Sequence, residues 1–210
     1  RYEFSRADQF TLAPCRHPYR IDVTAAAGAD GVLTALAVDV LVDAGAYGNH
    51  STGVMFHSCS ESMSLYRCAN KWVDAQAVYT NNLPSGAFRG YGLSQMIFAI
   101  ESALDELALQ LRIDPFDFRR RNVVVPGDEF VDHSVGHGDL TFGSYGLDQC
   151  LDLTQQALAD GNGVSGPEGW AVGEGMAVAM IATIPPRGHF AEASVAVTAD
   201  GNYLLSVGTA

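Results

Sequence analysis

A glycine-rich segment separates a predicted strand from a predicted helix in the middle of the chain. Residues 84–92 read Pro-Ser-Gly-Ala-Phe-Arg-Gly-Tyr-Gly, with glycines at positions 86, 90 and 92. Glycine allows a backbone to turn through positive φ or to approach a ligand closely. Phe88 can anchor such a loop in a core, Arg89 can donate to an anion or oxo group, and Tyr91 can offer a flat face to a planar ligand. On spacing alone, a tight turn and a ligand-binding loop are both open.

Alternating apolar and polar residues predict the strands that lead to this segment. Residues 17–24 and 32–43 both alternate, and a turn at Asp30-Gly31 joins them, so they are typical of a β-hairpin. Residues 70–80 alternate again and lead directly into the glycine-rich segment. We therefore expect the segment to follow a strand that belongs to the same part of the fold as the hairpin.

An amphipathic helix is predicted over residues 94–111. Its apolar stripe has the spacing of one helical face and consists of Ile97, Ile100, Leu104, Leu107 and Leu111. Its carboxylates lie largely off that stripe, so we expect them in solvent without a general-base role: Glu101, Asp105 and Glu106. A second helix should begin after Asp114 as N-cap, with Pro115 at its first position, and end near Asn122. Residues 119–121, three arginines, would form its cationic last turn.

The remainder of the chain predicts one more helix and one more hairpin. Residues 148–159 are amphipathic, and residues 161–169 are rich in glycine, as is typical of a linker. Two alternating runs, 192–197 and 203–207, flank an Asp-Gly turn and echo the first hairpin. The predicted fold class is α+β, with mixed sheets and helices.

Composition limits the partners and the compartment. The 210 residues carry a net charge of −12, which disfavours nucleic acid and anionic membranes as partners. No apolar run reaches the ~20 residues of a membrane span, and the four cysteines are scattered, as in a reducing compartment, so we expect a cytoplasmic protein. His133 and His137 are four residues apart, but the glycines beside them disfavour the helix that would align them on a metal.

The central segment resembles a known family signature. Residues 86–92, Gly-Ala-Phe-Arg-Gly-Tyr-Gly, are similar to the Ala-Phe-Arg-Gly-(Phe/Tyr)-Gly motif of the molybdenum-binding large subunit of the xanthine dehydrogenase and aldehyde oxidase family. The likeness continues through residues 101–108 and 114–122, and it extends upstream through Asp43-Ala-Gly-Ala-Tyr47. It covers most of the chain.

The resemblance implies a cofactor and partners. Members hydroxylate a carbon beside nitrogen or oxygen at a pterin-bound molybdenum, with water as the oxygen source, so a small aromatic substrate or an aldehyde is expected. The molybdopterin would be in its plain form or the cytosine dinucleotide form, while iron–sulfur and FAD groups would sit on partner chains or domains of a multi-subunit complex. Phe88, Arg89 and Gly90 would bind the cofactor, with the Arg89 backbone next to molybdenum, and Tyr91 would stack on the substrate.

Two departures from the family pattern concern the substrate. His57 stands where xanthine-oxidising members carry an arginine, and imidazole lacks the fixed donor fork of a guanidinium. Ala182-Thr183 matches a Phe-Thr pair, so Thr183 can donate a hydrogen bond while Ala182 leaves room for a larger or different ring. His57 and Thr183 are therefore expected to contact a substrate other than xanthine.

Two family segments are not found in the 210 residues, and this shapes the functional hypothesis. One is glycine-rich, and the other carries the glutamate that acts as general base, so that base is expected outside this chain. We expect a first molybdopterin-binding domain over residues 1–160, without its N-terminal glycine-rich segment, then a linker at 161–169 and the truncated start of a second domain at 170–210. The chain would require the remainder of the large subunit and would be inactive by itself. The alternative is a non-catalytic assembly or binding module derived from the same fold.

Overall fold

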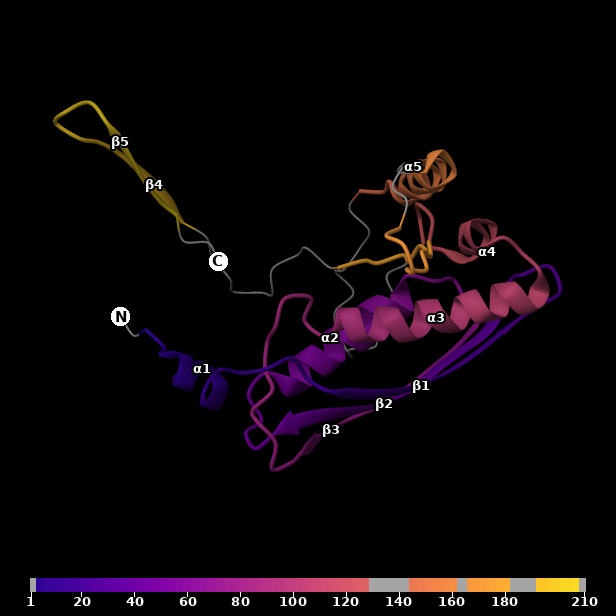
Figure 1. The fold of residues 1–210 in the computed structure, drawn as a ribbon, viewed down its shortest axis with the longest axis horizontal. Helices are drawn as coiled ribbons and strands as arrows, with labels where there is room; N and C mark the ends of the chain where they lie inside the picture. The colour runs from indigo at the N-terminus through magenta and orange to yellow at the C-terminus, as the bar shows by residue number, and fades with distance from the viewer. Residues whose placement is uncertain (1–2, 129–143, 162–165, 182–191, 208–210) are drawn as a thin grey trace.

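The fold combines two separate sheets with five helices in the part of the chain that the structure describes. The computed structural model describes residues 3–128, 144–161, 166–181 and 192–207. In chain order the elements are α1 (Arg6–Thr11), β1 (Tyr19–Ala27), β2 (Leu33–Gly45), α2 (Ser51–Ser64), β3 (Asn70–Tyr79), α3 (Leu93–Leu111), α4 (Pro115–Asn122), α5 (Leu147–Asp160), β4 (Ala193–Val197) and β5 (Tyr203–Val207). Figure 1 shows the sheet of β1 to β3 below α2 and α3, with α4 and α5 above them. The predicted α+β class is confirmed.

A three-stranded mixed sheet forms the base of the molecule. The strand order is β1-β2-β3, with β1 antiparallel and β3 parallel to the central strand, so that Val38 lies between Val23 and Val73. A parallel pair requires a crossover, and α2 supplies it. The inward-facing side chains of β2 are buried: Leu36, Val38, Val40 and Val42. The predicted hairpin and the predicted third strand are both confirmed.

Helix α2 occupies residues 51–64, where the sequence pattern did not predict a helix. This helix contains five serines, all buried, at positions 51, 58, 60, 62 and 64. Ser60 Oγ donates to the Phe56 carbonyl at 2.8 Å, and Ser64 Oγ donates to the Ser60 carbonyl at 2.7 Å. Because these hydroxyls bond their own helix, polar residues can face the core, and the apolar stripe that marks an amphipathic helix is missing.

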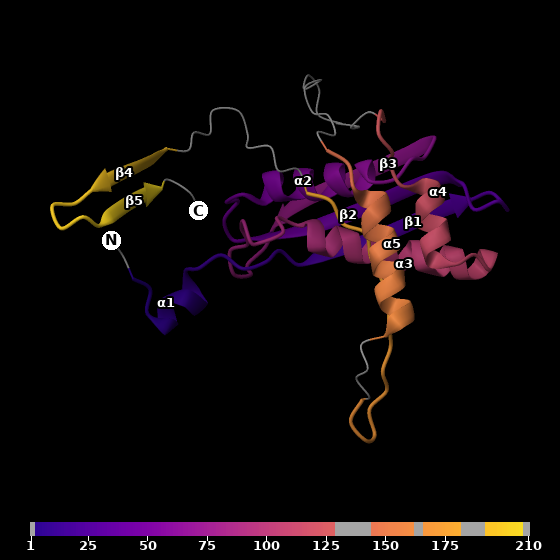
Figure 2. The same cartoon turned by 90° about the horizontal axis from the view of Figure 1, so that it is seen from above.

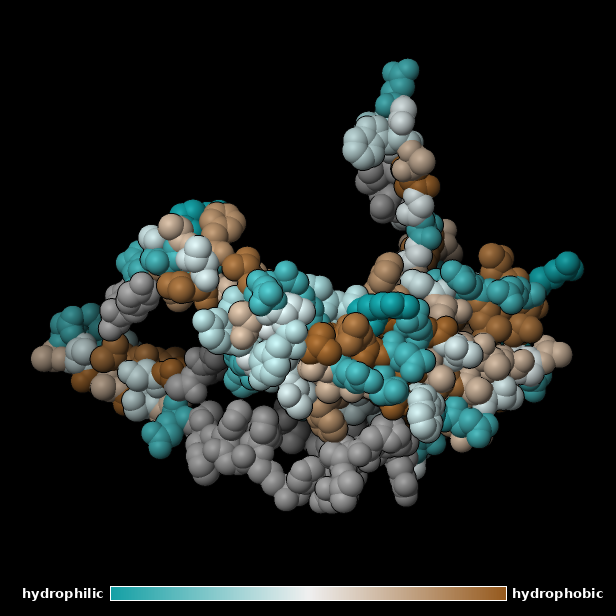
Figure 3. All heavy atoms as spheres, turned by 90° about the horizontal axis from the view of Figure 1, so that it is seen from below, coloured by the Kyte–Doolittle hydropathy of each residue, from teal (hydrophilic) through white to brown (hydrophobic). Residues whose placement is uncertain are grey.

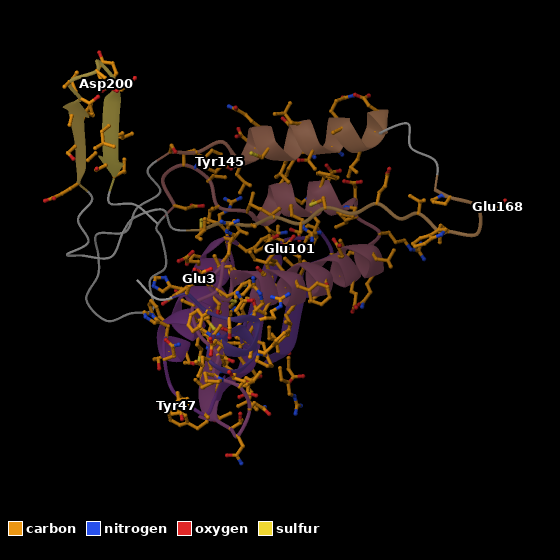
Figure 4. The ribbon with its side chains drawn as sticks, turned by 60° about the vertical axis from the view of Figure 1, so that its left-hand side comes forward. Glu3, Tyr47, Glu101, Tyr145, Glu168 and Asp200 are labelled. Carbon is orange, nitrogen blue, oxygen red and sulfur yellow. The ribbon has the colours of Figure 1, made fainter. Side chains whose placement is uncertain are left out.

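The expectation that the carboxylates of α3 lie in solvent is wrong for Glu101. Its side chain is buried, and Arg119 of α4, itself fully buried, bonds it with an N–O distance of 3.0 Å. Tyr66 donates its hydroxyl to the same carboxylate, and the Val178 backbone N–H donates to it at 2.9 Å. Figure 4 shows Glu101 inside the molecule among the helices. A buried carboxylate needs such partners, because an unpaired charge is expensive to remove from water.

The buried cluster shifts the pKa of two of its members, Tyr66 and Arg119. Burial, together with the neighbouring Glu101 carboxylate, holds the pKa of Tyr66 well above its ordinary value. Burial opposes the charge of Arg119 and is the largest single effect on it, but Glu101, Tyr66 and Asp105 together outweigh burial and raise the pKa of that guanidinium. The predicted cationic last turn of α4 is confirmed, and the buried side chain of Arg119 in that turn joins α4 to α3.

The predicted start of α4 is confirmed. Asp114 is its N-cap and accepts from the backbone N–H of Phe116 at 2.9 Å. At its other end, the buried Asn122 side chain donates to the Gly31 carbonyl at 2.8 Å and accepts from the Leu33 N–H at 2.8 Å. These bonds fasten α4 to the turn between β1 and β2, so α4 closes one end of the sheet.

The C-terminal part of the chain contains the predicted helix and hairpin. A cavity of about 190 Å³ lies between α4, α5 and residues 176–179. β4 and β5 pair antiparallel, and every residue of both strands is exposed. Figure 2 shows this hairpin apart from the helices that cover β1 to β3.

Among the described residues, none of the helices combines the length and apolar character that a membrane crossing requires.

Candidate functional site

The glycine-rich segment at residues 84–92 connects β3 to α3 and is held by backbone hydrogen bonds from two sides. Cys15 N–H donates to the Pro84 carbonyl at 2.9 Å, and Gly86 N–H donates to the Cys15 carbonyl at 3.1 Å. On the other side, Ser85 N–H donates to the Ala44 carbonyl at 3.1 Å. A Cβ on Gly86 would lie 2.8 Å from the Pro14 side chain, so this close approach requires glycine.

Three consecutive residues in this segment adopt positive φ. The φ angles are 93° at Gly90, 46° at Tyr91 and 88° at Gly92, which is the N-cap of α3. A tyrosine is uncommon in the left-handed region, where non-glycine residues occur mostly at turns and functional sites. The Tyr91 N–H donates to the Phe88 carbonyl at 2.7 Å. The expectation that glycine would serve positive φ is confirmed at positions 90 and 92.

Arg16 organises the outer side of the loop, and the sequence analysis missed it. Its guanidinium donates to the Arg89 carbonyl at 2.7 Å and lies 4.5 Å from the ring centroid of Phe88. Phe88 is 50% exposed, so the expectation that it anchors the loop in a core is wrong. The cation above the ring holds Phe88 at the surface instead. Two guanidinium groups therefore lie at the loop: that of Arg89, which belongs to it and is exposed, and that of Arg16, which contacts it.

Helix α2 brings a second predicted residue to the loop. The rings of His57 and Tyr91 have centroids 5.4 Å apart and meet at an interplanar angle of 71°. His50, the N-cap of α2, lies with Nδ1 3.1 Å from the Tyr91 hydroxyl. A Cβ on Gly53 would come within 3.0 Å of that hydroxyl. Tyr91 and His57 are thus neighbours, as a shared ligand would require, whereas Thr183 lies outside the described residues.

A buried carboxylate stands behind His57. Glu61 is four residues further along α2, and its Oε1 lies 2.9 Å from Nδ1 of His57. The Glu61 side chain is 5% exposed and that of His57 is 41% exposed. Residues i and i+4 share one helix face, so the spacing of these two residues was the available signal. Glu61 was not predicted as a site residue, because no helix was predicted over α2.

Another histidine, His17, is buried beside the start of α2. His17 Nε2 lies 2.8 Å from Ser51 Oγ, while Nδ1 has no hydrogen-bond partner among the described residues. Burial lowers the pKa of His17, although the nearby Asp43 carboxylate opposes that shift. Asp43 itself accepts from Thr80 at 2.7 Å and from the Gly45 N–H at 2.8 Å. These bonds hold the C-terminal end of β2, where Asp43 lies, next to Thr80 at the end of β3.

The described residues contain no group of three or more histidines, cysteines or acidic residues that could hold a metal ion. His133 and His137 lie outside the described residues. All four cysteines are free. The chemistry that the site itself offers is therefore hydrogen bonding, cationic side chains and an aromatic face.

Comparison with known proteins identifies a matching family and several relatives. The family described as molybdopterin cofactor-binding domain matches residues 1–123. The Escherichia coli (strain K12) protein described as "Probable hypoxanthine oxidase XdhD" is 30% identical over 215 aligned positions, which cover 100% of this chain and 22% of that protein. The nicotinate dehydrogenase large molybdopterin subunit of Eubacterium barkeri is 33% identical over 160 positions, covering 74% of this chain and 36% of that protein.

Two solved structures of oxidoreductases share the fold of this chain. Quinoline 2-oxidoreductase from Pseudomonas putida 86 superposes with a TM-score of 0.65 at 29% identity, covering 75% of this chain and 20% of that one. The aldehyde oxidoreductase from Desulfovibrio gigas superposes with a TM-score of 0.63 at 29% identity, covering 73% of this chain and 16% of that one. The chain thus spans between about a sixth and about a third of the length of these relatives.

Proposed function

The chain belongs to the molybdopterin cofactor-binding domain family, and we propose that it forms part of the large subunit of a molybdenum hydroxylase. The whole protein would oxidatively hydroxylate an N-heterocycle or an aldehyde, with water as the oxygen source. Electrons would pass to iron–sulfur and flavin partners. The observation that carries this proposal is the positive-φ loop at residues 90–92, which joins two guanidinium groups on one side to the Tyr91–His57 pair on the other.

The residues of the loop fit a pterin cofactor by their chemistry. The loop ends at the N-terminus of α3, a 19-residue helix, where backbone N–H groups and the helix dipole favour anionic groups. Arg16 and Arg89 add two cations that can bind phosphate or oxo groups. When bound, the molybdenum-pterin group supplies the two-electron redox chemistry. Phe88, Arg89 and Gly90 would hold it, in its plain or cytosine dinucleotide form, and the bond from Arg16 to the Arg89 carbonyl fixes the backbone that would face it.

The substrate side of the site consists of aromatic groups. Tyr91 offers a ring face, and His57 lies edge-to-face with it, which confines a ligand to a planar shape. The names of three relatives refer to hypoxanthine, nicotinate and quinoline, all planar N-heterocycles. Another relative is an aldehyde oxidoreductase, so the preference for an N-heterocycle over an aldehyde rests on the two rings of the site. Thr183 is proposed as an additional hydrogen-bond donor to the substrate.

The domain boundaries follow from the same proposal. We assign residues 1–160 to a first molybdopterin-binding domain, residues 161–169 to a linker and residues 170–210 to the start of a second domain. The general base would come from another part of the large subunit, and the assembled complex would work in the cytoplasm. The isolated chain is therefore expected to show no turnover.

Molybdenum and pterin content of the natively assembled protein tests the proposal. Near-stoichiometric molybdenum is expected in the wild type, and a loss of at least about tenfold in Arg89→Ala, because the exposed guanidinium supplies a charge-assisted contact. Arg20→Ala is the matched control, since Arg20 is an exposed arginine on β1 that pairs with Asp22, and it should leave the content unchanged. An intact complex without molybdenum would overturn the proposal and favour an assembly module.

A further inference from the structure

We propose that the first turn of α2 positions the Tyr91 ring through its hydroxyl, so that the site selects a planar ligand. His50, the N-cap of α2, acts as a positioning residue, and Gly53 leaves the space that the hydroxyl needs. The hydroxyl itself binds α2, and the ring is left to contact the ligand. This inference rests on the proposed function, because it assigns a specificity element to the same site. His50 and Gly53 both lie outside the glycine-rich segment at residues 84–92.

The neighbours of Tyr91 in the chain give its ring little restraint. Tyr91 has a φ of 46° and lies between Gly90 and Gly92, which have φ angles of 93° and 88°. Neither glycine carries a side chain that could pack against the ring. A tyrosine in the left-handed region persists only when the surrounding structure holds it there. The contacts that hold the ring therefore come from another element, which is α2.

Three positions on one face of α2 meet the Tyr91 side chain. His50 Nδ1 lies 3.1 Å from the Tyr91 hydroxyl, and a Cβ on Gly53 would lie 3.0 Å from the same oxygen. The ring of His57 has its centroid 5.4 Å from that of Tyr91. Positions 50, 53 and 57 are three and four residues apart, so they share one helix face. The hydroxyl is therefore held at the start of this face, and the ring lies further along it.

The contact between His50 and Tyr91 does not depend on the protonation of the imidazole. A tyrosine hydroxyl can donate one hydrogen bond and can also accept. It donates to Nδ1 of His50 when that nitrogen has a lone pair, and it accepts when that nitrogen carries a proton. His50 makes no side-chain hydrogen bond to the start of α2, although it is the N-cap. Its imidazole therefore serves the loop and not the helix end.

A ring that is held by its hydroxyl favours flat ligands. Ordering a free side chain at a binding site costs affinity, and a contact that exists before binding removes this cost. A planar ligand benefits most, because two flat surfaces touch over their whole area. A puckered ligand of the same size touches the ring with few atoms. Loss of the His50 contact should therefore reduce the affinity for planar ligands selectively.

Quinolin-2-one, which is planar, and decahydroquinolin-2-one, which is puckered, test this selection on the assembled protein by calorimetry. Tyr91→Phe and His50→Ala should each reduce the affinity for the planar probe by about two- to tenfold and leave that for the puckered probe nearly unchanged. The double variant should lose no more than either single variant, because both remove the same bond. Equal losses for the two probes, or additive losses in the double variant, would overturn the inference.

Conservative variants separate positioning from a general loss of structure. The amide of asparagine can occupy the place of Nδ1, whereas that of glutamine lies nearer to Nε2. His50→Asn should therefore keep the wild-type affinity, and His50→Gln should behave as His50→Ala. Gly53→Ala should displace the hydroxyl and weaken binding of the planar probe, with no further effect in Tyr91→Phe, which lacks that hydroxyl. Thr52→Ala, at an exposed position of the same turn, is the matched control. Wild-type affinity in His50→Gln or in Gly53→Ala would contradict the proposal.

The hydroxyl contact has a readout that does not require molybdenum. In the assembled protein labelled with carbon-13 at Cζ of tyrosine, the NMR signal that is absent from Tyr91→Phe belongs to Tyr91. This signal should shift in His50→Ala and return to its wild-type position in His50→Asn. No shift in His50→Ala would refute the role of His50. An intact complex without molybdenum would overturn the proposed function alone, because the Tyr91 signal would still decide whether His50 holds the ring.

Discussion

The two antiparallel hairpins of this protein have similar sequences but different environments. β1–β2 and β4–β5 both alternate valines, and each turns through Ala-Asp-Gly with a glycine at a φ of 80° or 84°. In the first hairpin Val38 is fully buried, whereas in the second Val195 is 66% exposed. In Figure 4, Glu101 lies inside the body of the molecule and Asp200 lies at the tip of the second hairpin.

The difference shows that strand pairing is a local property and burial is not. The first turn is covered by α4, where Asn122 bonds Gly31 and a Cβ on Gly31 would lie 2.6 Å from Ile113. No atom of the described residues lies within 4 Å of the equivalent position on Gly201. A hairpin without further cover is marginally stable in water. The helices over β1 and β2, and not the hairpin sequence, make the first hairpin part of a core.

The face of the three-stranded sheet opposite α2 and α3 adds to the comparison. Asp22, Asp39 and Asp74 lie side by side on adjacent strands of that face, and Trp72 is 65% exposed on it. Figure 3, viewed from below, shows hydrophilic and hydrophobic residues mixed there. Only the side of the sheet that α2 and α3 cover has a continuous apolar surface, so even the first hairpin is buried on one face alone.

Removing the buried arginine should have the largest effect on the packed region. Arg119→Met leaves the Glu101 carboxylate buried without its cation, so the free energy of unfolding should fall by about 3–5 kcal/mol, measured by urea denaturation. Glu101→Gln in the same background should restore part of the loss, because it removes the uncompensated charge. Arg20→Met breaks an exposed ion pair and should stay within about 0.5 kcal/mol. Equal losses in Arg119→Met and Arg20→Met would contradict the buried-pair argument.

Truncating one leucine in each hairpin compares their burial directly. Leu36→Ala in β2, where the side chain is fully buried, should lower the free energy of unfolding by about 2–5 kcal/mol through lost contacts and a residual cavity. Leu205→Ala in β5, where the side chain is 62% exposed, should change it by less than about 0.5 kcal/mol. If both variants lost the same stability, the second hairpin would be packed in solution.

The two turn glycines separate backbone strain from packing. Gly31→Ala and Gly201→Ala both force alanine into positive φ, which costs about 1–2 kcal/mol. Only Gly31→Ala also meets a neighbour, the Ile113 side chain, so it should be the more destabilising variant by roughly 1 kcal/mol. Thermal unfolding of the two variants measures the difference. A larger loss at Gly201 would mean that its turn is covered.

The smallest effect concerns pH. Because burial lowers the pKa of His17 below its ordinary value of 6.5, the unfolded chain binds that proton more readily, so stability is complete above pH 6.5 and declines as pH falls through the folded pKa. His17→Gln should remove this slope, which is at most about 1.4 kcal/mol per pH unit. In the second hairpin, the hydrogen bond from Thr198 lowers the pKa of Asp200 below 3.8. Asp200→Asn should therefore not change the dependence of stability on pH above about pH 5. An unchanged slope in His17→Gln would refute the assignment.

Particular residues show where sequence reasoning succeeded and where it failed. The strands of both hairpins, the long helix α3 and the Asp114 cap of α4 were predicted because each is encoded by local periodicity or local hydrogen bonding. Helix α2 was missed because five buried serines, three of which donate to carbonyls of the same helix, remove the apolar stripe. The short helix α1 was missed as well, although Ser5 and Asp8 form a capping box. At the site, the glycines and Tyr91 were recognised, whereas Arg16, His50 and Glu61 were not.

The sequence alone determined the α+β class, the glycine-rich loop before α3 and the family signature within it. Only the tertiary structure decided that Glu101 is buried against Arg119, that Arg16 covers Phe88, and that α2 places Glu61, His57 and His50 around Tyr91. The physical reason is the distance along the chain over which each interaction acts. Periodicity, caps and turns act over a few residues, whereas these contacts join more distant positions: Glu101 and Arg119 are 18 residues apart, and His57 and Tyr91 are 34 apart. Such pairs, like His57 with Tyr91, exist only after the chain has folded.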